Sequence, residues 1–300
     1  MYNAHIVFFI SLITCLFVCH IVSCHMEGCI NDTKNVYTLL TETYGWEQSC
    51  IKVLTDDLLD PNVRPTRANI ILWMRWLAED VRPGDVLFFF FSGMYILWLC
   101  VLQSLSQCIN IFHVVLGHGQ QKPDPNGYEE DGMNECILPM DFTYSGEITD
   151  DLMNSVMIRH LPSGVKLMTV MDCCHSGTGL DLPFQWNPWR LAWREETNPY
   201  HTKGDVQLIS GCVDEGVACD SSMYYNSPGG ALTHALCTYL RQNPCPTYPE
   251  LLDGLTAHIK QAGYRQRPVL SSSQGMYAFY VYMYVCMYVC ARKCIFCRDY

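Results

Sequence analysis

The feature that most constrains the fold is an apolar run at residues 165–171, which ends in Asp-Cys-Cys-His-Ser-Gly at residues 172–177. Short apolar runs of this kind are typical of strands buried inside a sheet. An α/β sheet presents functional side chains where its strands end, and a thiol in that position can act as a nucleophile. The stretch therefore predicts an α/β fold with a cysteine at the rim of its sheet.

The rest of the chain alternates between strand and helix patterns. The continuous apolar run at residues 85–91 is typical of a strand buried on both faces of a parallel sheet. Thr66 can cap one helix, and Thr247 and Glu250 form a capping-box pattern before another. This order predicts a mostly parallel sheet with helices on both faces. We expect strands at 51–54, 85–91, 165–171 and 205–211, and helices at 66–81, 229–240 and 251–261.

Three short boxes in this chain resemble those of the metacaspases, which are caspase-like cysteine peptidases. Residues 172–177 resemble the family's D-x-C-H-S-G box, and residues 28–32 resemble its G-C-x-N-D box. If residues 94–117 are left out, Ser92-Gly93 joins His118-Gly119, and the join resembles the S-G-H-G box. The resemblance extends over about residues 28–274 and implies a caspase-like fold.

The resemblance implies which residues would hydrolyse a peptide bond. Cys174 matches the nucleophile and His118 the general acid and base, while the backbone N–H groups of Cys174 and Gly119 would form the oxyanion hole. A free cysteine titrates near ~8.5, so Cys174 needs a neighbour that favours its thiolate. His175 is the weaker candidate for that role, because side chains adjacent in sequence diverge.

The resemblance also implies a pocket for the substrate side chain, lined by Cys29, Asp32, Ser92 and Asp172. Two carboxylates in a desolvated pocket favour a cationic side chain, and arginine can bind them through its bidentate fork. We therefore predict cleavage after Arg or Lys and none after Asp. The alternative for Asp32 is that it, or Asn31, caps the helix that follows.

Many metacaspases need calcium, a hard cation that takes roughly six to eight oxygen ligands. The resemblance carries the ligands onto Asp150, Asp151 and Asp181, with a fourth position at Asn134, which offers only a neutral carbonyl. One charge fewer predicts weak, millimolar binding. The alternative is that Asp150 and Asp151 stand in the first turn of a helix and complement its dipole. No organic cofactor is implied.

Three segments differ from the rest in composition: residues 1–26, 94–117 and 276–300. The first has no charged residue and is a leader of doubtful origin, because its apolar run is short for a membrane span and lacks the basic start of a signal peptide. A secretory or membrane-tethered protein is the alternative. In the family an apolar strand precedes residue 28, so either this end is misassigned or residues 6–22 supply a substitute strand. The last segment repeats Met-Tyr-Val-Cys and is a low-complexity tail.

The uncharged insertion at residues 94–117 separates Ser92 from His118. We hypothesise that it is a retained intron, and a lineage-specific insertion is the alternative. A misplacement of ~1 Å can cost a reaction ~100-fold in rate, so an insertion that displaces His118 would impair catalysis. The competing function is therefore a catalytically impaired caspase-fold protein, or a defective gene product, that acts by binding if it acts at all.

We expect one peptidase domain over residues 27–275. Within it, the polar residues 120–135 predict a loop, and residues 187–204, which have no clear period, predict a linker between a large and a small portion. Basic residues in this linker would suit the predicted pocket, so we hypothesise that the enzyme cleaves itself there. These basic residues are Arg190, Arg194 and Lys203.

The formal net charge of −11 argues against a nucleic-acid partner. Half of the 18 cysteines lie in the three unusual segments, and the others show no spacing of a disulfide framework, so we expect a reducing compartment, the cytoplasm. The expected partners are polypeptide substrates with Arg or Lys at the cleavage position. We expect no membrane attachment and, from the resemblance, a monomer.

Overall fold

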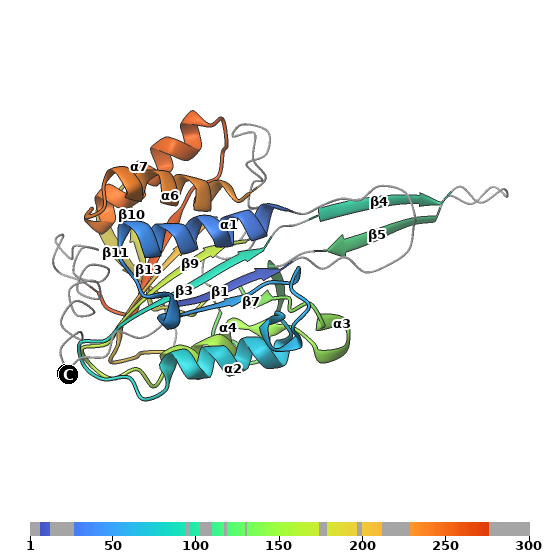
Figure 1. Ribbon diagram of the computed structural model, residues 1–300, viewed down its shortest axis with the longest axis horizontal. Coiled ribbons are helices and arrows are strands. Elements are labelled where there is room, and N and C mark those ends of the chain that lie inside the picture. The colour runs from blue at the N-terminus through green and yellow to red at the C-terminus, as the bar shows by residue number, and fades with distance from the viewer. Residues whose placement is uncertain are drawn as a thin grey trace.

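The computed structural model describes residues 7–12, 27–93, 96–102, 110–116, 119–129, 131–173, 179–196, 200–211 and 229–275. Of the ranges 7–12, 96–102 and 110–116 it describes only the backbone. A twisted sheet forms the middle layer, and helices cover both of its faces (Figure 1). Within the described ranges, no helix is long and apolar enough to cross a membrane.

The strands of the main sheet are β1 (Val7–Leu12), β2 (Ile51–Leu54), β3 (Val86–Gly93), β9 (Lys166–Asp172), β10 (Phe184–Asn187), β11 (Ala192–Glu195), β12 (Asp205–Ser210) and β13 (Val269–Ser272). Their order is β11-β10-β13-β12-β9-β3-β1-β2. Neighbouring strands from β12 to β2 run parallel, whereas β13, β10 and β11 extend the sheet in antiparallel fashion. The predicted mostly parallel sheet is therefore confirmed.

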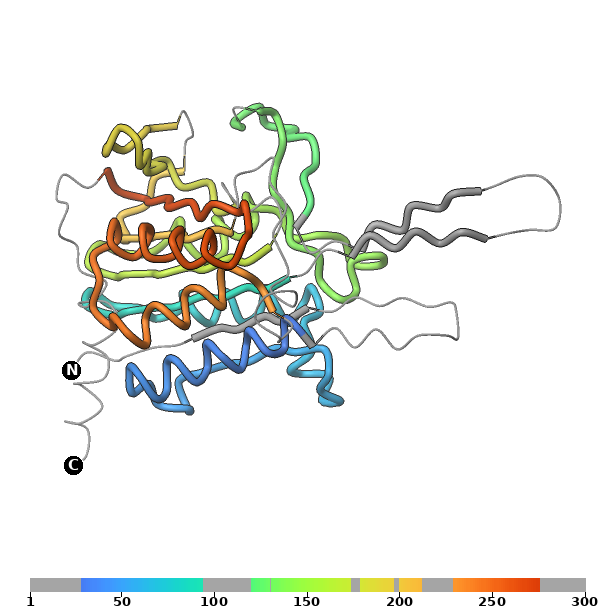
Figure 2. Tube along the Cα trace, turned by 90° about the horizontal axis from the view of Figure 1, so that it is seen from above, coloured from blue at the N-terminus to red at the C-terminus, as the bar shows by residue number. Residues whose placement is uncertain are grey.

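The helices form one layer on each side of this sheet. One layer holds α1 (Glu27–Thr38), α6 (Ala231–Gln242) and α7 (Tyr248–Gln261), which lie side by side (Figure 2). The other holds α2 (Arg67–Ala78), α4 (Asp150–Met153) and the π-helical turn η4 (Asn154–Ile158). Shorter elements are η1 (Leu39–Thr43), η2 (Gln48–Cys50), η3 (Pro61–Val63) and α3 (Phe142–Ser145).

Two predicted helix starts are confirmed by their hydrogen bonds. The Thr66 side chain accepts from the N–H of Asn69 at the start of α2. Thr247 and Glu250 form the reciprocal capping box at the start of α7. Each cap satisfies backbone N–H groups that have no partner within the helix, which fixes where the helix begins.

The all-apolar sequence of β3 follows from its place in the middle of the sheet. Phe88 and Phe90 pack into the core under α1, α6 and α7, while Phe89 and Phe91 pack into the core under α2 and η4. None of these four side chains is more than 2% exposed. A strand buried on both faces has no side that faces solvent, so none of its positions favours a polar residue.

Residues 7–12 form β1, which lies between β2 and β3. Val7 is opposite Ile51 on one side and Phe88 on the other, and the pairing is parallel with both neighbours. This arrangement corresponds to the second alternative for the amino end, in which residues 6–22 supply the strand. A parallel ladder is made by backbone groups, so a run that does not match the family's strand can still fill the position. Residues 1–6 and 13–26 lie outside the described residues.

The insertion contains a hairpin that projects from the sheet beyond the end of β3 (Figure 1). Its strands, β4 (Ile96–Leu102) and β5 (Asn110–Leu116), pair antiparallel, with Ile96 opposite Leu116. Directly paired residues of an antiparallel ladder lie about 5 Å apart at their Cα atoms. The hairpin therefore brings the chain back close to the point where it left the sheet.

The prediction of a loop over residues 120–135 is wrong at both ends. The chain forms a second, antiparallel sheet there, made of β6 (Gly119–Pro123), β7 (Met133–Ile137) and β8 (Ile148–Thr149). The described residues between these two strands, 124–129 and 131–132, have no helix or strand. The pairing joins residues distant in sequence, so a polar composition alone does not reveal it.

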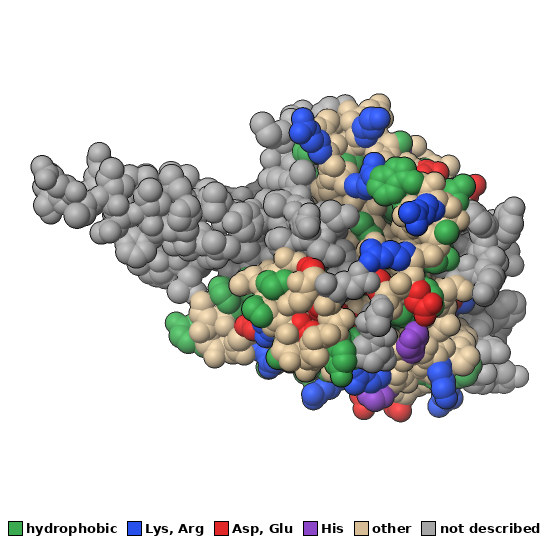
Figure 3. Space-filling model, turned by 180° about the vertical axis from the view of Figure 1, so that it is seen from behind, with side chains coloured by type: hydrophobic (Ala, Val, Ile, Leu, Met, Phe, Trp, Pro, Cys, Tyr) green, Lys and Arg blue, Asp and Glu red, His purple; other side chains and the backbone are tan. Residues whose placement is uncertain are grey.

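The linker predicted over residues 187–204 contains regular structure in its first half, where β10 and β11 form a hairpin at the edge of the sheet. Trp189 and Leu191 are exposed in its turn, and the guanidinium of Arg267 lies 4.3 Å from the Trp189 ring centroid. Lys and Arg side chains lie among hydrophobic ones on the face seen in Figure 3. Among the described strands, β11 pairs only with β10 and forms this edge of the sheet.

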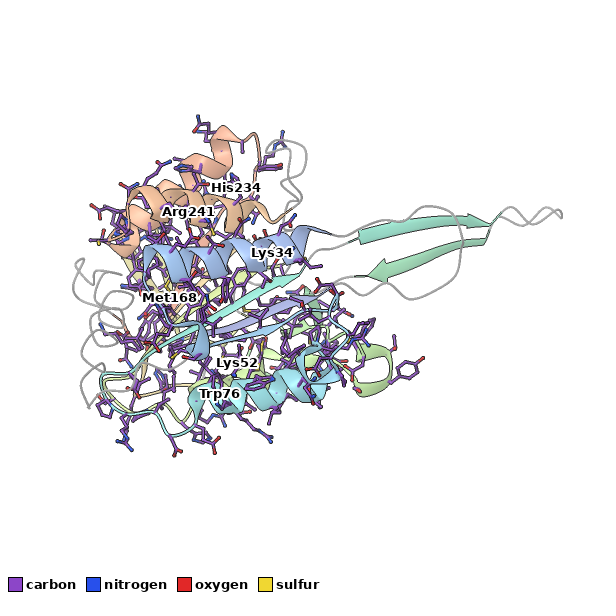
Figure 4. All side chains as sticks on the ribbon, viewed as in Figure 1. Lys34, Lys52, Trp76, Met168, His234 and Arg241 are labelled. Atoms are coloured by element: carbon purple, nitrogen blue, oxygen red, sulfur yellow. The ribbon has the colours of Figure 1, made fainter. Side chains whose placement is uncertain are left out.

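The opposite edge strand, β2, is tied to α2 by a cation–π contact. The Lys52 ammonium lies 5.4 Å from the ring centroid of Trp73 and 5.6 Å from that of Trp76. Figure 4 shows Lys52 on β2 beside Trp76 on α2. Both tryptophans are partly buried against the core below α2, so they pack the edge of the sheet.

Candidate active site and acid cluster

The carboxyl ends of β3 and β9 lie side by side and bring two of the predicted pocket residues together. Ser92 of β3 is the register partner of Asp172 of β9. Cys29 and Asp32 come from α1, where a spacing of three residues puts both on the buried face. Ser92 Oγ donates to Asp32 Oδ2 at 2.6 Å. Three separate segments thus meet at one end of the sheet.

The alternative that Asp32 or Asn31 caps its own helix is wrong. Helix α1 begins at Glu27, so both residues lie inside it. The Asp32 carboxylate accepts instead from the backbone N–H of Gly230, at 3.1 Å to Oδ1 and 2.9 Å to Oδ2. Gly230 is the N-cap residue of α6, so Asp32 satisfies the first turn of a different helix.

Asp172 satisfies the same helix end from the other side. Its Oδ2 accepts from the N–H of Thr233 at 2.8 Å and from Thr233 Oγ1 at 2.7 Å. Gly230 itself offers no side chain for capping. The N-terminus of α6 therefore holds both carboxylates, and it stabilises negative charge there through its N–H groups and its dipole.

Gly230 and Thr233 contact the predicted pocket residues Asp32 and Asp172, and sequence reasoning missed both of them. A Cβ added at Gly230 would overlap the Asp172 carboxylate, and one added at Gly211 would lie 3.2 Å from Asp172 Oδ1. The only signal in the sequence was negative: α6 starts after Gly229-Gly230, with no capping side chain of its own. When a helix has no capping side chain of its own, the backbone N–H groups of its first turn can donate to acceptors from elsewhere in the fold.

Two effects act in opposite directions on the protonation of Asp172. Burial raises its pKa, while hydrogen bonds from Thr233 and from Gln266 lower it. The burial effect prevails, so the carboxylate is poorly stabilised without a counterion. A cationic side chain placed beside it would favour the ionised form.

Cys174, His118 and His175 lie outside the described residues, and Gly119 is described as the first residue of β6. The described neighbours give their surroundings. Cys173 follows β9 directly and is 1% exposed, and β3 ends at Gly93. The segment with the predicted nucleophile therefore follows β9, and the insertion that precedes the predicted base follows the adjacent parallel strand β3 at the same end of the sheet. The catalytic roles stay predictions.

A second group of acids lies on the other side of β9. Oxygen atoms of Glu129, Asp150 and Asp181 all lie within 4.8 Å of one another, and we call these three residues the acid cluster. Asp150 starts α4 after the N-cap Thr149 and is 0% exposed. Asp181 follows the nucleophile segment, with a backbone φ of 52°, a conformation that Asp tolerates better than most residues.

The structure brings together only part of the predicted calcium set. Asp150 and Asp181 belong to the acid cluster, whereas the carboxylate of Asp151 does not. Asn134 donates through Nδ2 to Asp151 Oδ2 at 3.0 Å, so these two predicted ligands contact each other. Sequence reasoning did not name Glu129 as a candidate ligand, because it placed residues 120–135 in a polar loop.

Burial and mutual repulsion make the acid cluster a poor place for three negative charges. Burial raises the pKa of Glu129 to about 7; a hydrogen bond with Asp181 acts against this, and the charges of other nearby acids add to it. Burial and then the charge of Glu135 raise the pKa of Asp150 to about 9. Burial, followed by the charges of Asp150 and Glu129, raises the pKa of Asp181 well above its usual range. A bound cation would remove this penalty, and an all-oxygen donor set fits a hard divalent cation such as calcium.

The fold and the paired strand ends define a caspase-like α/β protein. The chain belongs to the metacaspase family: the description "Metacaspase, peptidase C14 domain" matches residues 12–98 and 95–183. The two matched parts meet at residues 95–98, inside the insertion. The resemblance seen in the sequence is thus confirmed, and the chain carries a peptidase C14 domain.

Curated relatives agree with this assignment. Metacaspase-1 of Plasmodium falciparum is 36% identical over 255 residues, which cover 83% of this chain and 38% of that protein. Metacaspase-1A of Aspergillus niger is 30% identical over 298 residues, covering 84% of this chain and 67% of that protein. The chain thus spans between about two-fifths and two-thirds of the length of these two relatives. A crystal structure from Geobacter sulfurreducens, 18% identical with a TM-score of 0.54, covers 90% of this chain and 93% of its own and shares the fold.

Proposed function

We propose that this protein is a cysteine endopeptidase that cleaves polypeptides after Arg or Lys. The Cys174 thiolate attacks the carbonyl carbon of the scissile bond, and the N–H groups of Gly119 and Cys174 stabilise the oxyanion. His118 protonates the leaving amine, and water then hydrolyses the thioester with His118 as its base. The adjacent ends of β3 and β9 support this assignment, because the segment with Cys174 follows β9 directly and the insertion that leads to His118 begins at the end of β3.

The observation that carries the specificity is the pair of buried carboxylates at the N-terminus of α6. Asp32 and Asp172 come from different elements, and both lie against Gly230. A guanidinium or ammonium group would neutralise this site, and the five N–H donors of arginine can serve both carboxylates. An aspartate side chain of a substrate would add a third negative charge and would be repelled.

The hairpin of the insertion supports an active enzyme over the competing, catalytically impaired protein. Because Ile96 pairs with Leu116, the insertion returns to its starting point and does not require Gly93 and Gly119 to separate by its full length. A chain that lacks residues 94–117 tests this directly. Equal peptidase activity of both chains supports the active form, and activity of the shortened chain alone identifies the chain as written as the impaired protein.

The peptidase proposal is tested with fluorogenic peptides that end in Arg, Lys or Asp. We expect Cys174→Ala to lower kcat/KM at least about 1,000-fold, because the reaction loses its nucleophile. Cys173→Ala is the matched control, since that thiol is buried and takes no part in the mechanism. Cleavage of the Asp peptide in preference to the other two, or full activity of Cys174→Ala, would refute the proposal.

We further propose that calcium binds at the acid cluster with Asp151 and Asn134 beside it. Calcium would supply positive charge that holds the loops from β6–β7 and after β9 together. Calorimetric titration with calcium is expected to give a dissociation constant on the order of 10⁻⁴–10⁻³ M, as in sites of low charge. Asp150→Ala should abolish the binding heat, because it removes one of the three carboxylates of the acid cluster. Retained binding in this variant would contradict the assignment.

A monomeric, cytoplasmic enzyme is the form that we propose. Four cysteines of the described part of the chain, Cys50, Cys136, Cys237 and Cys245, are free thiols, which suits a reducing compartment.

A further inference from the structure

Tyr200 joins the end of the linker to the neighbourhood of the acid cluster. Its hydroxyl donates to Asp151 Oδ1, and the residue is 8% exposed. The ring of Tyr128 meets its ring edge-to-face at 6.0 Å, and the guanidinium of Arg159 lies 4.9 Å from its centroid. Two residues further on, Thr202 Oγ1 donates to a backbone carbonyl of η4 at 2.9 Å. The segment between β11 and β12 is thus anchored beside the cluster.

Asp151 is next to the acid cluster but is kept out of it by hydrogen bonds. Its N–H donates to Asp150 Oδ1 at 2.8 Å, so the two residues share the first turn of α4. Tyr200 holds its Oδ1, while the amides of Asn126 and Asn134 hold its Oδ2 at 3.2 and 3.0 Å. All of these donors are neutral, so none of them compensates the charge as a cation would.

A divalent cation in the acid cluster would attract Asp151 as a further ligand. Three carboxylates give at most six oxygens, and a hard cation such as calcium takes roughly six to eight. Burial, Asp150 and Glu129 raise the pKa of Asp181, and the charge of Asp151 raises it further, so Asp151 already acts on the cluster. Burial and Asp151 raise the pKa of the Tyr200 hydroxyl, and the charge of Asp181 raises it further. The hydroxyl is therefore close enough to interact with the charges of the acid cluster.

We propose that Tyr200 and a divalent cation compete for the Asp151 carboxylate, so that cation binding releases the end of the linker. The inference rests on the proposed calcium site. A cation at Oδ1 displaces only Tyr200, because both asparagine amides donate to the other oxygen. The two effects are linked. The Tyr200 hydrogen bond lowers the affinity for the cation by some factor, and the bound cation weakens that hydrogen bond by the same factor. Release would loosen residues 200–203, which include the basic residue Lys203.

Calorimetric titration with calcium chloride tests the competition on the full chain, in a Cys174→Ala background that prevents self-cleavage. Tyr200→Phe removes the hydroxyl and keeps the ring contacts. Tyr248→Phe is the matched control, since it removes a hydroxyl that donates to Gln207 at 3.0 Å in the core. We expect Tyr200→Phe to bind calcium about tenfold more tightly, because a hydrogen bond to a carboxylate no longer opposes the cation. Tyr248→Phe should bind like the parent, and equal affinity of all three chains would overturn the proposal.

Hydrogen exchange of the parent chain gives a second readout that needs no further variant. Protection of the amides at residues 200–204 should fall about tenfold when calcium saturates the site, matching the affinity change by linkage. Unchanged protection would overturn the competition. A parent chain that binds no calcium refutes the proposed calcium site as well, whereas calcium binding that Tyr200→Phe leaves unaltered refutes the competition alone.

Discussion

Gly230→Ala is expected to lower kcat/KM for Arg and Lys peptides at least about 100-fold, the loss that a displacement of ~1 Å can cause. The backbone of Gly230, at φ −77° and ψ 140°, is open to any residue, so the substitution introduces no backbone strain. The effect comes from contact: the new Cβ would overlap the carboxylate of Asp172. Either Asp172 or the start of α6 must move, and the N–H of Gly230 then moves away from Asp32.

Gly254→Ala is the matched control for this substitution. Its Cβ would overlap the ring of Tyr239 between α6 and α7, so it also overpacks the core, at a cost of about 1–3 kcal/mol. We expect both variants to lower the melting temperature, and only Gly230→Ala to lower kcat/KM per folded molecule. Peptidase activity of Gly230→Ala within about threefold of the parent would show that the two carboxylates do not form the substrate pocket.

Without divalent cations, the melting temperature is expected to fall as the pH rises from 5 to 9. The folded-state pKa values of Glu129 and Asp150 are raised to about 7 and about 9. In this range the folded chain binds more protons than the unfolded chain, so stability decreases with pH. The stability that these two acids contribute is fully present below the ordinary pKa of a carboxyl group. It is lost as the pH rises through their folded-state pKa values. One pKa unit is worth about 1.4 kcal/mol, so Asp150 alone contributes on the order of several kcal/mol.

Calorimetric scans at pH 5, 7 and 9, in EDTA and in excess calcium, measure this dependence. Calcium binds the deprotonated acids, so it should raise the melting temperature most at pH 9 and least at pH 5. Asp150→Asn removes an acid whose pKa is raised to about 9 and should flatten the curve in EDTA. A melting temperature in EDTA that rises from pH 5 to pH 9 would contradict the burial of unneutralised acids in the cluster.

The layers of this fold could be predicted from sequence because their signals are local. The run of four phenylalanines predicts β3 directly, because a strand buried on both faces has no polar side. Thr66 and Thr247 act within four residues of the groups they cap. The strands β6, β10 and β11 were missed, because each depends on a partner strand that sequence patterns do not reveal.

In the candidate site, too, residues in local sequence patterns could be predicted, whereas contacts between distant segments could not. Asp32 and Asp172 were found through their boxes, but their shared contact with Gly230 depends on how α6 crosses the ends of the strands. Glu129 joins Asp150 only because β6 and β7 fold back over α4. No local pattern could reveal the contact between Tyr200 and Asp151, which are 49 residues apart in the chain.

The position of β1 has a consequence for any processing of the amino end. Among the described strands, β2 has no sheet neighbour other than β1. Removal of residues 1–26 would therefore detach β2 and leave the N–H and C=O groups on that side of β3 unpaired. A long apolar edge of this kind is a template for pairing with other chains. We therefore expect a chain without residues 1–26 to aggregate. The main sheet stays intact only when these residues are retained.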